Sequence, residues 1–189
     1  DLRSGTWATG TPKPTAVANY ATAQLGDRVY LIGGWNSDAP AQFLNTVEAY
    51  DLATDTWSVC APLPRPLAGM AAVAVGGKVY AFGGRNEGAT SRNTFIYDPQ
   101  ARTWSQGAAL PVDVVYGNAV SLDGLIYIAG GWPASDALLR YDPASDSWAV
   151  LAPMHTGRQS CGMVAVGGLI YVAGGGDEWD GLASVERYD

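Results

Sequence analysis

Four pairs of consecutive glycines divide the 189-residue chain at nearly regular intervals, and this repetition limits its fold more than any other feature. Each pair directly follows a short apolar run whose second residue is a tyrosine. The pairs are Gly33-Gly34, Gly83-Gly84, Gly130-Gly131 and Gly174-Gly175. A period of about 40 to 50 residues indicates a chain of repeated units, each of which buries its apolar surface against its neighbours.

Two further landmarks recur in the same order. A Tyr-Asp pair closes each repeat, and a tryptophan follows six residues after the aspartate. The tyrosines are Tyr50, Tyr97, Tyr141 and Tyr188, and the tryptophans, including one that precedes the first repeat's glycines, are Trp7, Trp57, Trp104 and Trp148. The tryptophan lies 26 residues before the next glycine pair in every repeat (7 to 33, 57 to 83, 104 to 130, 148 to 174). The length variation therefore falls between the glycines and the tyrosine, where solvated backbone tolerates insertions.

The pattern within a repeat predicts four antiparallel strands, which we call a to d in chain order. Strand a is rich in small residues, strand b is the apolar run before the glycine pair, strand c ends at Tyr-Asp and strand d carries the tryptophan. The expected a strands are residues 17–23, 68–75, 116–122 and 161–166. Strand b is apolar at successive positions, which is typical of a strand with another sheet on each side.

These motifs resemble the signature of kelch repeats over essentially the whole chain. The resemblance implies an all-β fold, a β-propeller of four four-stranded antiparallel blades with strand a nearest the axis. It implies one propeller region over residues 1–189, with repeats at about 1–50, 51–97, 98–141 and 142–189. It also implies that an N-terminal strand, here Thr6 to Thr9, completes the last blade, either in its own chain or in a neighbouring one.

Ring closure leaves three interpretations, because kelch propellers usually have five to seven blades. The strand of Trp7 closes a four-bladed ring within the chain, or it completes the last blade of another copy by self-association in a larger ring. In the third interpretation the sequence is a piece of a longer propeller. The second and third interpretations together are favoured over the first.

Composition excludes several function classes. A net charge of −7 disfavours electrostatic binding to nucleic acid or to an anionic membrane. No apolar stretch approaches the roughly 18 to 20 residues of a membrane-spanning helix. The single histidine excludes any site that needs two, and we expect no metal and no cofactor. The sequence does not indicate a cellular compartment.

Three tryptophans lie outside the repeating positions, and all three fall in the b–c connections. These connections lie at the same end of a blade as the d–a connections, so polar residues from both should surround the rings. Exposed aromatic rings among hydrogen-bonding groups are typical of a recognition surface. The alternative is that these rings only cap the blade ends. The predicted binding residues are Trp35, Asn36, Arg65, Arg85, Asn86, Trp132, His155, Arg158, Asp177 and Trp179.

The sequence favours a non-catalytic module that binds a protein or peptide partner at this end. No nucleophile–base pair, metal-ligand set or phosphate-binding loop stands out, so we expect no enzymatic activity. The alternative is carbohydrate binding or activity similar to that of sugar mutarotases, because tryptophan rings stack on sugars. Arg158 also resembles, weakly, the arginine that often lines the axial pocket of kelch propellers.

Overall fold

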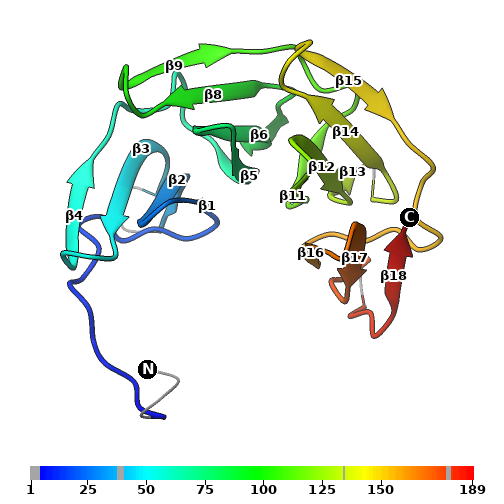
Figure 1. Cartoon of the computed structure of the whole chain (residues 1–189), viewed down its shortest axis with the longest axis horizontal. Coiled ribbons are helices and arrows are strands. Elements are labelled where there is room, and N and C mark those ends of the chain that lie inside the picture. The colour runs from blue at the N-terminus through cyan, green and yellow to red at the C-terminus, as the bar shows by residue number, and fades with distance from the viewer. Residues whose placement is uncertain (1–4, 38–40, 134, 178–179) are drawn as a thin grey trace.

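A computed structural model describes residues 5–37, 41–133, 135–177 and 180–189. These residues form antiparallel sheets that stand side by side in an arc around a common axis (Figure 1). The described residues contain only strands, turns and irregular segments, which confirms the predicted all-β propeller architecture. Over the same residues no helix is long and apolar enough to cross a membrane.

The first two blades have four strands each, in the expected order. Blade 1 consists of β1 (Ala21–Leu25), β2 (Arg28–Asn36), β3 (Gln42–Asp51) and β4 (Thr56–Val59). Blade 2 consists of β5 (Ala68–Val75), β6 (Lys78–Asn86), β8 (Thr94–Asp98) and β9 (Thr103–Gln106). The short β7 (Ala89–Thr90) pairs with β6 in the b–c connection.

The last two blades differ in their number of strands. Blade 3 consists of β11 (Asn118–Leu122), β12 (Leu125–Ala129), β14 (Leu138–Asp142) and β15 (Ser147–Val150). Beside it, β10 (Val114–Val115) pairs with β13 (Trp132–Pro133). Blade 4 has three strands, β16 (Gly162–Val166), β17 (Leu169–Ala173) and β18 (Val185–Tyr188).

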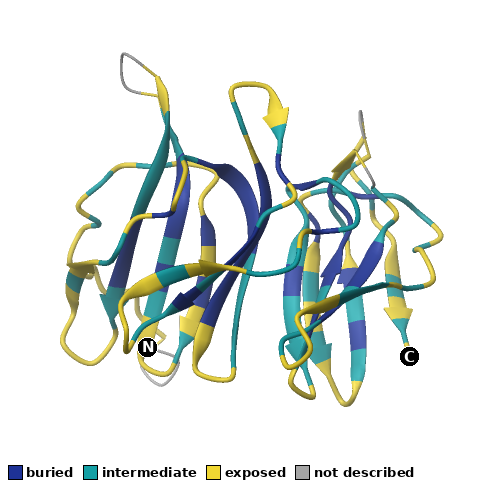
Figure 2. Ribbon diagram, turned by 90° about the horizontal axis from the view of Figure 1, so that it is seen from above, coloured by how far each residue is buried: buried dark blue, intermediate teal, exposed yellow. Residues whose placement is uncertain are grey.

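The core lies between blades rather than within any one of them. Each of three apolar clusters joins residues of two neighbouring blades. Figure 2, a view turned by 90°, shows buried positions along the strands and exposed positions in the turns at both ends. A blade therefore depends on its neighbour for most of its hydrophobic stabilisation.

The repeated tryptophans connect consecutive blades. The indole nitrogen of Trp104 donates a hydrogen bond to the carbonyl of Ala61 at 2.8 Å, and that of Trp148 donates to the carbonyl of Ala108 at 2.9 Å. Trp57 donates in the same way to the carbonyl of Thr11 at 2.8 Å. Each ring also packs against the Tyr-Asp tyrosine of its own blade, with ring centroids 4.9 to 5.0 Å apart. These three tryptophans are structural, as the spacing predicts.

The first glycine of each pair is needed because the next blade comes close. A Cβ atom at Gly33, Gly83 or Gly130 would collide with a backbone carbonyl of the following d–a connection. The colliding carbonyls belong to Leu67, Val114 and Arg158. All three glycines also have positive φ, a conformation that glycine adopts without a steric penalty. The glycine pairs are therefore part of the blade packing.

The arc is open between blade 1 and blade 4 (Figure 1). Residues 6–9, predicted as the outer strand of the last blade, form no strand and extend away from blade 1, and Trp7 is fully exposed. The interpretation in which this strand closes a four-bladed ring within its own chain is therefore wrong for this structure. The other two interpretations stay open.

The contacts between blades predict a specific loss of stability for Trp148→Phe. The variant keeps an aromatic ring but removes the N–H donor for the Ala108 carbonyl and part of the buried surface. We expect the free energy of unfolding, measured by urea denaturation, to fall by about 1 to 3 kcal/mol. The control Val150→Thr changes an exposed side chain on the same strand and should cost less than about 0.5 kcal/mol. Equal losses in the two variants would contradict this role for the indole.

Candidate functional site

Four residues with the same position in each repeat surround the axis at the end that carries the b–c and d–a connections. Each lies 14 residues before the first glycine of its pair and has positive φ. They are Asn19, Gly69, Tyr116 and Ser160, and we call them the axial positions. The N–H of Gly69, Tyr116 and Ser160 each donates at 2.8 Å to the carbonyl of the preceding axial position. These bonds hold the loops of neighbouring blades at a fixed separation.

Side chains from blades 2, 3 and 4 meet beside the axial positions. Gln159 lines three adjoining hollows. One is shared with Trp132 and Asp177, and another with Arg85, Trp132 and Tyr116. We call Arg85, Tyr116, Trp132, Gln159 and Asp177 the axial site.

Arg85 is the exposed cation of the axial site. It lies at the glycine-pair end of β6, and its guanidinium carbon is 5.8 Å from the ring centroid of Tyr116 and 6.0 Å from that of Phe43. Phe43 belongs to blade 1 and Tyr116 to blade 3, so the guanidinium lies between rings of two other blades. Cation–π attraction to both rings orients the group, while its exposure leaves N–H donors for a ligand.

Trp132 supplies the exposed aromatic surface of the site. Its side chain is 45% exposed, although its backbone is paired with Val115 in the β10–β13 ladder. Asp177 is exposed nearby, and its carboxylate accepts a hydrogen bond from the Asp180 N–H at 2.9 Å within a tight turn. An exposed ring thus lies among groups that can donate or accept hydrogen bonds.

Arg158 does not line the axial hollows as its place in the sequence suggests. Its side chain is 0% exposed and is enclosed by acceptors from β18 and the connections around it. The guanidinium donates to the carbonyls of Thr156, Gly174 and Ser184, to the Ser184 hydroxyl at 2.9 Å and to the Glu186 carboxylate at 2.8 Å. Because these acceptors occupy the donors of the group, Arg158 stabilises blade 4.

Glu186 organises the same buried network. Burial alone would raise the pKa of its carboxyl, but hydrogen bonds from the His155 N–H, the Arg158 guanidinium and the Thr156 N–H outweigh this effect and lower the pKa to about 2. The exposed His155 ring lies 3.1 Å from the carboxylate, from Nδ1 to Oε2. His155 therefore belongs to the outer side of blade 4 rather than to the axial site.

The remaining predicted residues have other positions. Trp35 and Asn36 extend β2, where half-buried Trp35 pairs with Phe43. The Asn86 amide donates to the Pro66 carbonyl at 3.0 Å, whereas Arg65 is exposed on the d–a connection of blade 2. Trp179 lies outside the described residues.

The structure thus brings together three of the predicted residues, Arg85, Trp132 and Asp177. Sequence reasoning missed Tyr116 and Gln159, which complete the axial site. The signal for Tyr116 was its register, since the same position is Asn19 and Gly69 in other repeats, and Asn and Gly are enriched at positive φ. Within the described residues no group of three or more His, Cys, Asp and Glu side chains could hold a metal ion.

Four repeated blades, joined edge to face around an axis with hollows at one end, define the class of β-propeller scaffolds. Comparison with known families gives the particular family. The model described as the KLHDC2/KLHL20/DRC7 Kelch-repeats domain matches residues 1–175, and the chain belongs to the kelch-repeat family. A search of curated proteins found no match. Kelch propellers generally mediate protein interactions and are generally non-enzymatic.

The Glu186 network predicts a dependence of stability on pH. Because the pKa of Glu186 is lower in the folded chain than in the unfolded one, its contribution is complete at neutral pH and is lost as the pH falls from about 5 towards 2. Glu186→Gln should lower the free energy of unfolding at pH 7 by about 2 to 4 kcal/mol, since Arg158 loses its charged partner.

The same variant should also show a shallower loss of stability in acid, measured by urea denaturation at several pH values. Glu87→Gln, which changes an exposed carboxylate in the β6–β7 turn, is the control and should leave the pH profile unchanged. An unaltered acid profile in Glu186→Gln would contradict the depressed pKa.

Proposed function

We propose that the axial site binds a segment of a partner protein, as the recognition surface of a non-catalytic interaction module. The observation that carries the proposal is the convergence of side chains from three blades around Gln159. Arginine and tryptophan are enriched among residues that dominate binding energy at protein interfaces. Membership of the kelch-repeat family supports a protein partner over other ligands.

The arrangement of the axial site suggests how a peptide segment is recognised. Arg85 can donate hydrogen bonds to a carboxylate or a backbone carbonyl of the partner, and its ring contacts reduce the conformational entropy that binding removes. Trp132 offers an apolar face for a side chain, and Gln159 between them can both donate and accept. The site therefore suits a short segment with a polar group and an apolar side chain close together.

A second candidate ligand is a carbohydrate. The observation that favours it is the exposed Trp132 ring beside Gln159 and Asp177, since an aromatic face can cover the C–H surface of a sugar while polar side chains bind its hydroxyls. The protein-segment proposal is preferred because Arg85, between two aromatic rings, gives the site a cation that a neutral sugar does not require.

Selection of peptides from a random displayed library, followed by calorimetric titration of the selected peptides, tests the proposal. Arg85→Gln and Trp132→Ala should each weaken binding by tenfold or more, equivalent to about 1.4 kcal/mol or more. Both side chains are exposed, so the free energy of unfolding should change little.

Lys78→Gln is the matched control for Arg85→Gln. Lys78 is an exposed cation at the opposite end of the same strand, β6, so its removal changes the net charge equally without touching the axial site. If Lys78→Gln weakens peptide binding as much as Arg85→Gln, the axial site is not the binding surface. Binding on a glycan array that depends on Trp132, without any selected peptide, would replace the protein segment by the carbohydrate.

A further inference from the structure

Blade 4 exposes a face that the other blades bury. Val185 of β18 is 64% exposed, whereas the residues at its position in blades 1 and 3, Val47 and Leu138, are 1% and 2% exposed. Those residues pack against the following blade. Val164 and Val166 of β16 are exposed as well. Blade 4 therefore has the apolar face of an internal blade without a following blade against it.

A pocket on the outer side of blade 4 matches the place of a further tryptophan. Each acceptor of a tryptophan N–H lies four residues after the preceding tryptophan in the chain, as Ala61 follows Trp57 and Ala108 follows Trp104. By this spacing the next acceptor is the carbonyl of Ala152, four residues after Trp148. Ala152 lines a pocket together with Leu138, Met154, Ile170 and Tyr188.

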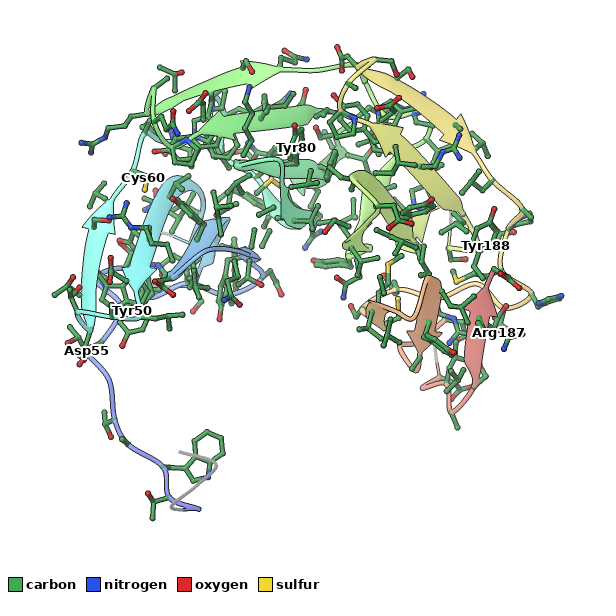
Figure 3. All side chains as sticks on the ribbon, viewed as in Figure 1. Tyr50, Asp55, Cys60, Tyr80, Arg187 and Tyr188 are labelled. Carbon is green, nitrogen blue, oxygen red and sulfur yellow. The ribbon has the colours of Figure 1, made fainter. Side chains whose placement is uncertain are left out.

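The same pocket contains the expected ring partner. Tyr188 is the Tyr-Asp tyrosine of blade 4, equivalent to Tyr50, Tyr97 and Tyr141, which each pack against a tryptophan of their own blade. Figure 3 labels Tyr188 on β18 and Tyr50 on the outer side of blade 1. In the sheet of blade 4, β18 pairs with β17 on one edge only, so its other edge can accept a strand.

The N-terminal segment carries a tryptophan in the matching register. Thr11, four residues after Trp7, accepts the N–H of Trp57, so the segment already occupies the position that strand d of a preceding blade would have. Trp7 itself is fully exposed. The segment thus holds the feature that blade 4 lacks, at the opposite end of the arc (Figure 1).

The backbone at the two ends of the arc is also complementary. The hydrogen bonds between axial positions run from each N–H to the preceding carbonyl, so among the described residues the series ends at the carbonyl of Ser160 and begins at the N–H of Asn19. Likewise the N–H of Gly34 and Gly131 donate to carbonyls of the following blade. A Cβ atom at Gly174, unlike one at Gly33, would meet only the Leu182 carbonyl, at 3.5 Å.

Blade 1 offers apolar surface on the side that faces the opening. Tyr20 is 42% exposed, and Val29 and Leu31 alternate along β2 with the buried Tyr30 and Ile32. A following blade with these residues would cover Val164, Val166 and Val185 of blade 4.

We propose that blade 1 of a second copy of this chain follows blade 4, and that residues 5–9 of that copy form the missing strand beside β18. The Trp7 indole of the second copy fills the pocket at Tyr188 and donates to the Ala152 carbonyl. The contact is head-to-tail, so two copies close a ring of eight blades, within the usual range for propellers, and leave no unpaired strand edge between copies. The proposal uses the sides of the arc and does not depend on the axial site.

Sedimentation velocity over a wide concentration range tests the second copy as occupant. We expect a monomer of 19.8 kDa at low concentration and a species of about twice that mass at high concentration. Trp7→Ala should weaken the association at least tenfold without changing the unfolding of the monomer, because Trp7 is exposed there. Val59→Ser, a change of an exposed apolar residue on β4, is the control and should leave the association unchanged.

A synthetic peptide of residues 1–12 with a fluorescent label tests the docking of the strand directly. The receptor is the full chain with Trp7→Ala, whose own segment then competes poorly. We expect saturable binding, with at least tenfold weaker binding of the same peptide carrying Trp7→Ala. Amide exchange at Val185–Tyr188 should slow when the peptide binds, since the free edge of β18 becomes paired.

The outcomes separate clearly. A monomer at every concentration, an association that Trp7→Ala does not weaken, or equal binding of the two peptides would overturn the proposal. Species larger than a dimer that require Trp7 would support the docked strand and overturn closure at eight blades. Arg85→Gln should leave the association intact, so failure here and failure of the proposed partner binding are distinguishable.

Discussion

The hydrogen bond from each outer-strand indole to a carbonyl of the preceding repeat is the contact on which this structure depends. It joins residues about 40 to 46 positions apart, as in Trp148 with Ala108 and Trp57 with Thr11, and it fixes the distance between consecutive outer strands. The glycine pairs do the same nearer the axis, where only a residue without a Cβ atom permits the close approach of the next blade. Between these two contacts the apolar strands pack without large voids.

The fold could be predicted because both contacts leave a mark at constant spacing. A tryptophan 26 residues before a glycine pair recurs in every repeat, and strand b is apolar on both faces, so the sequence already implies sheets that pack on both sides. The Asp residues of the c–d turns behave as expected as well, since the Asp51 and Asp98 carboxylates accept turn N–H groups.

The candidate site could be predicted only in part. Arg158 was expected at the axial pocket because arginine usually lies at the surface, but its partners Ser184 and Glu186 are brought to it by the pairing of β17 with β18, which is a tertiary event. Trp35 was expected on a loop, yet β2 and β3 continue past the glycine pair and include it. Tyr116 and Gln159 fall in the d–a connections, where no unusual residue type marks them.

The axial positions have a consequence for how such a propeller can diversify. Asn19, Gly69, Tyr116 and Ser160 are joined through backbone groups alone, so the series of hydrogen bonds does not depend on which side chain each blade carries. Every blade therefore presents one side chain towards the axis from an equivalent backbone geometry. A designer could treat these positions as a combinatorial alphabet, one letter per blade, in which the chemistry at the axis is rewritten while the packing between blades is left untouched.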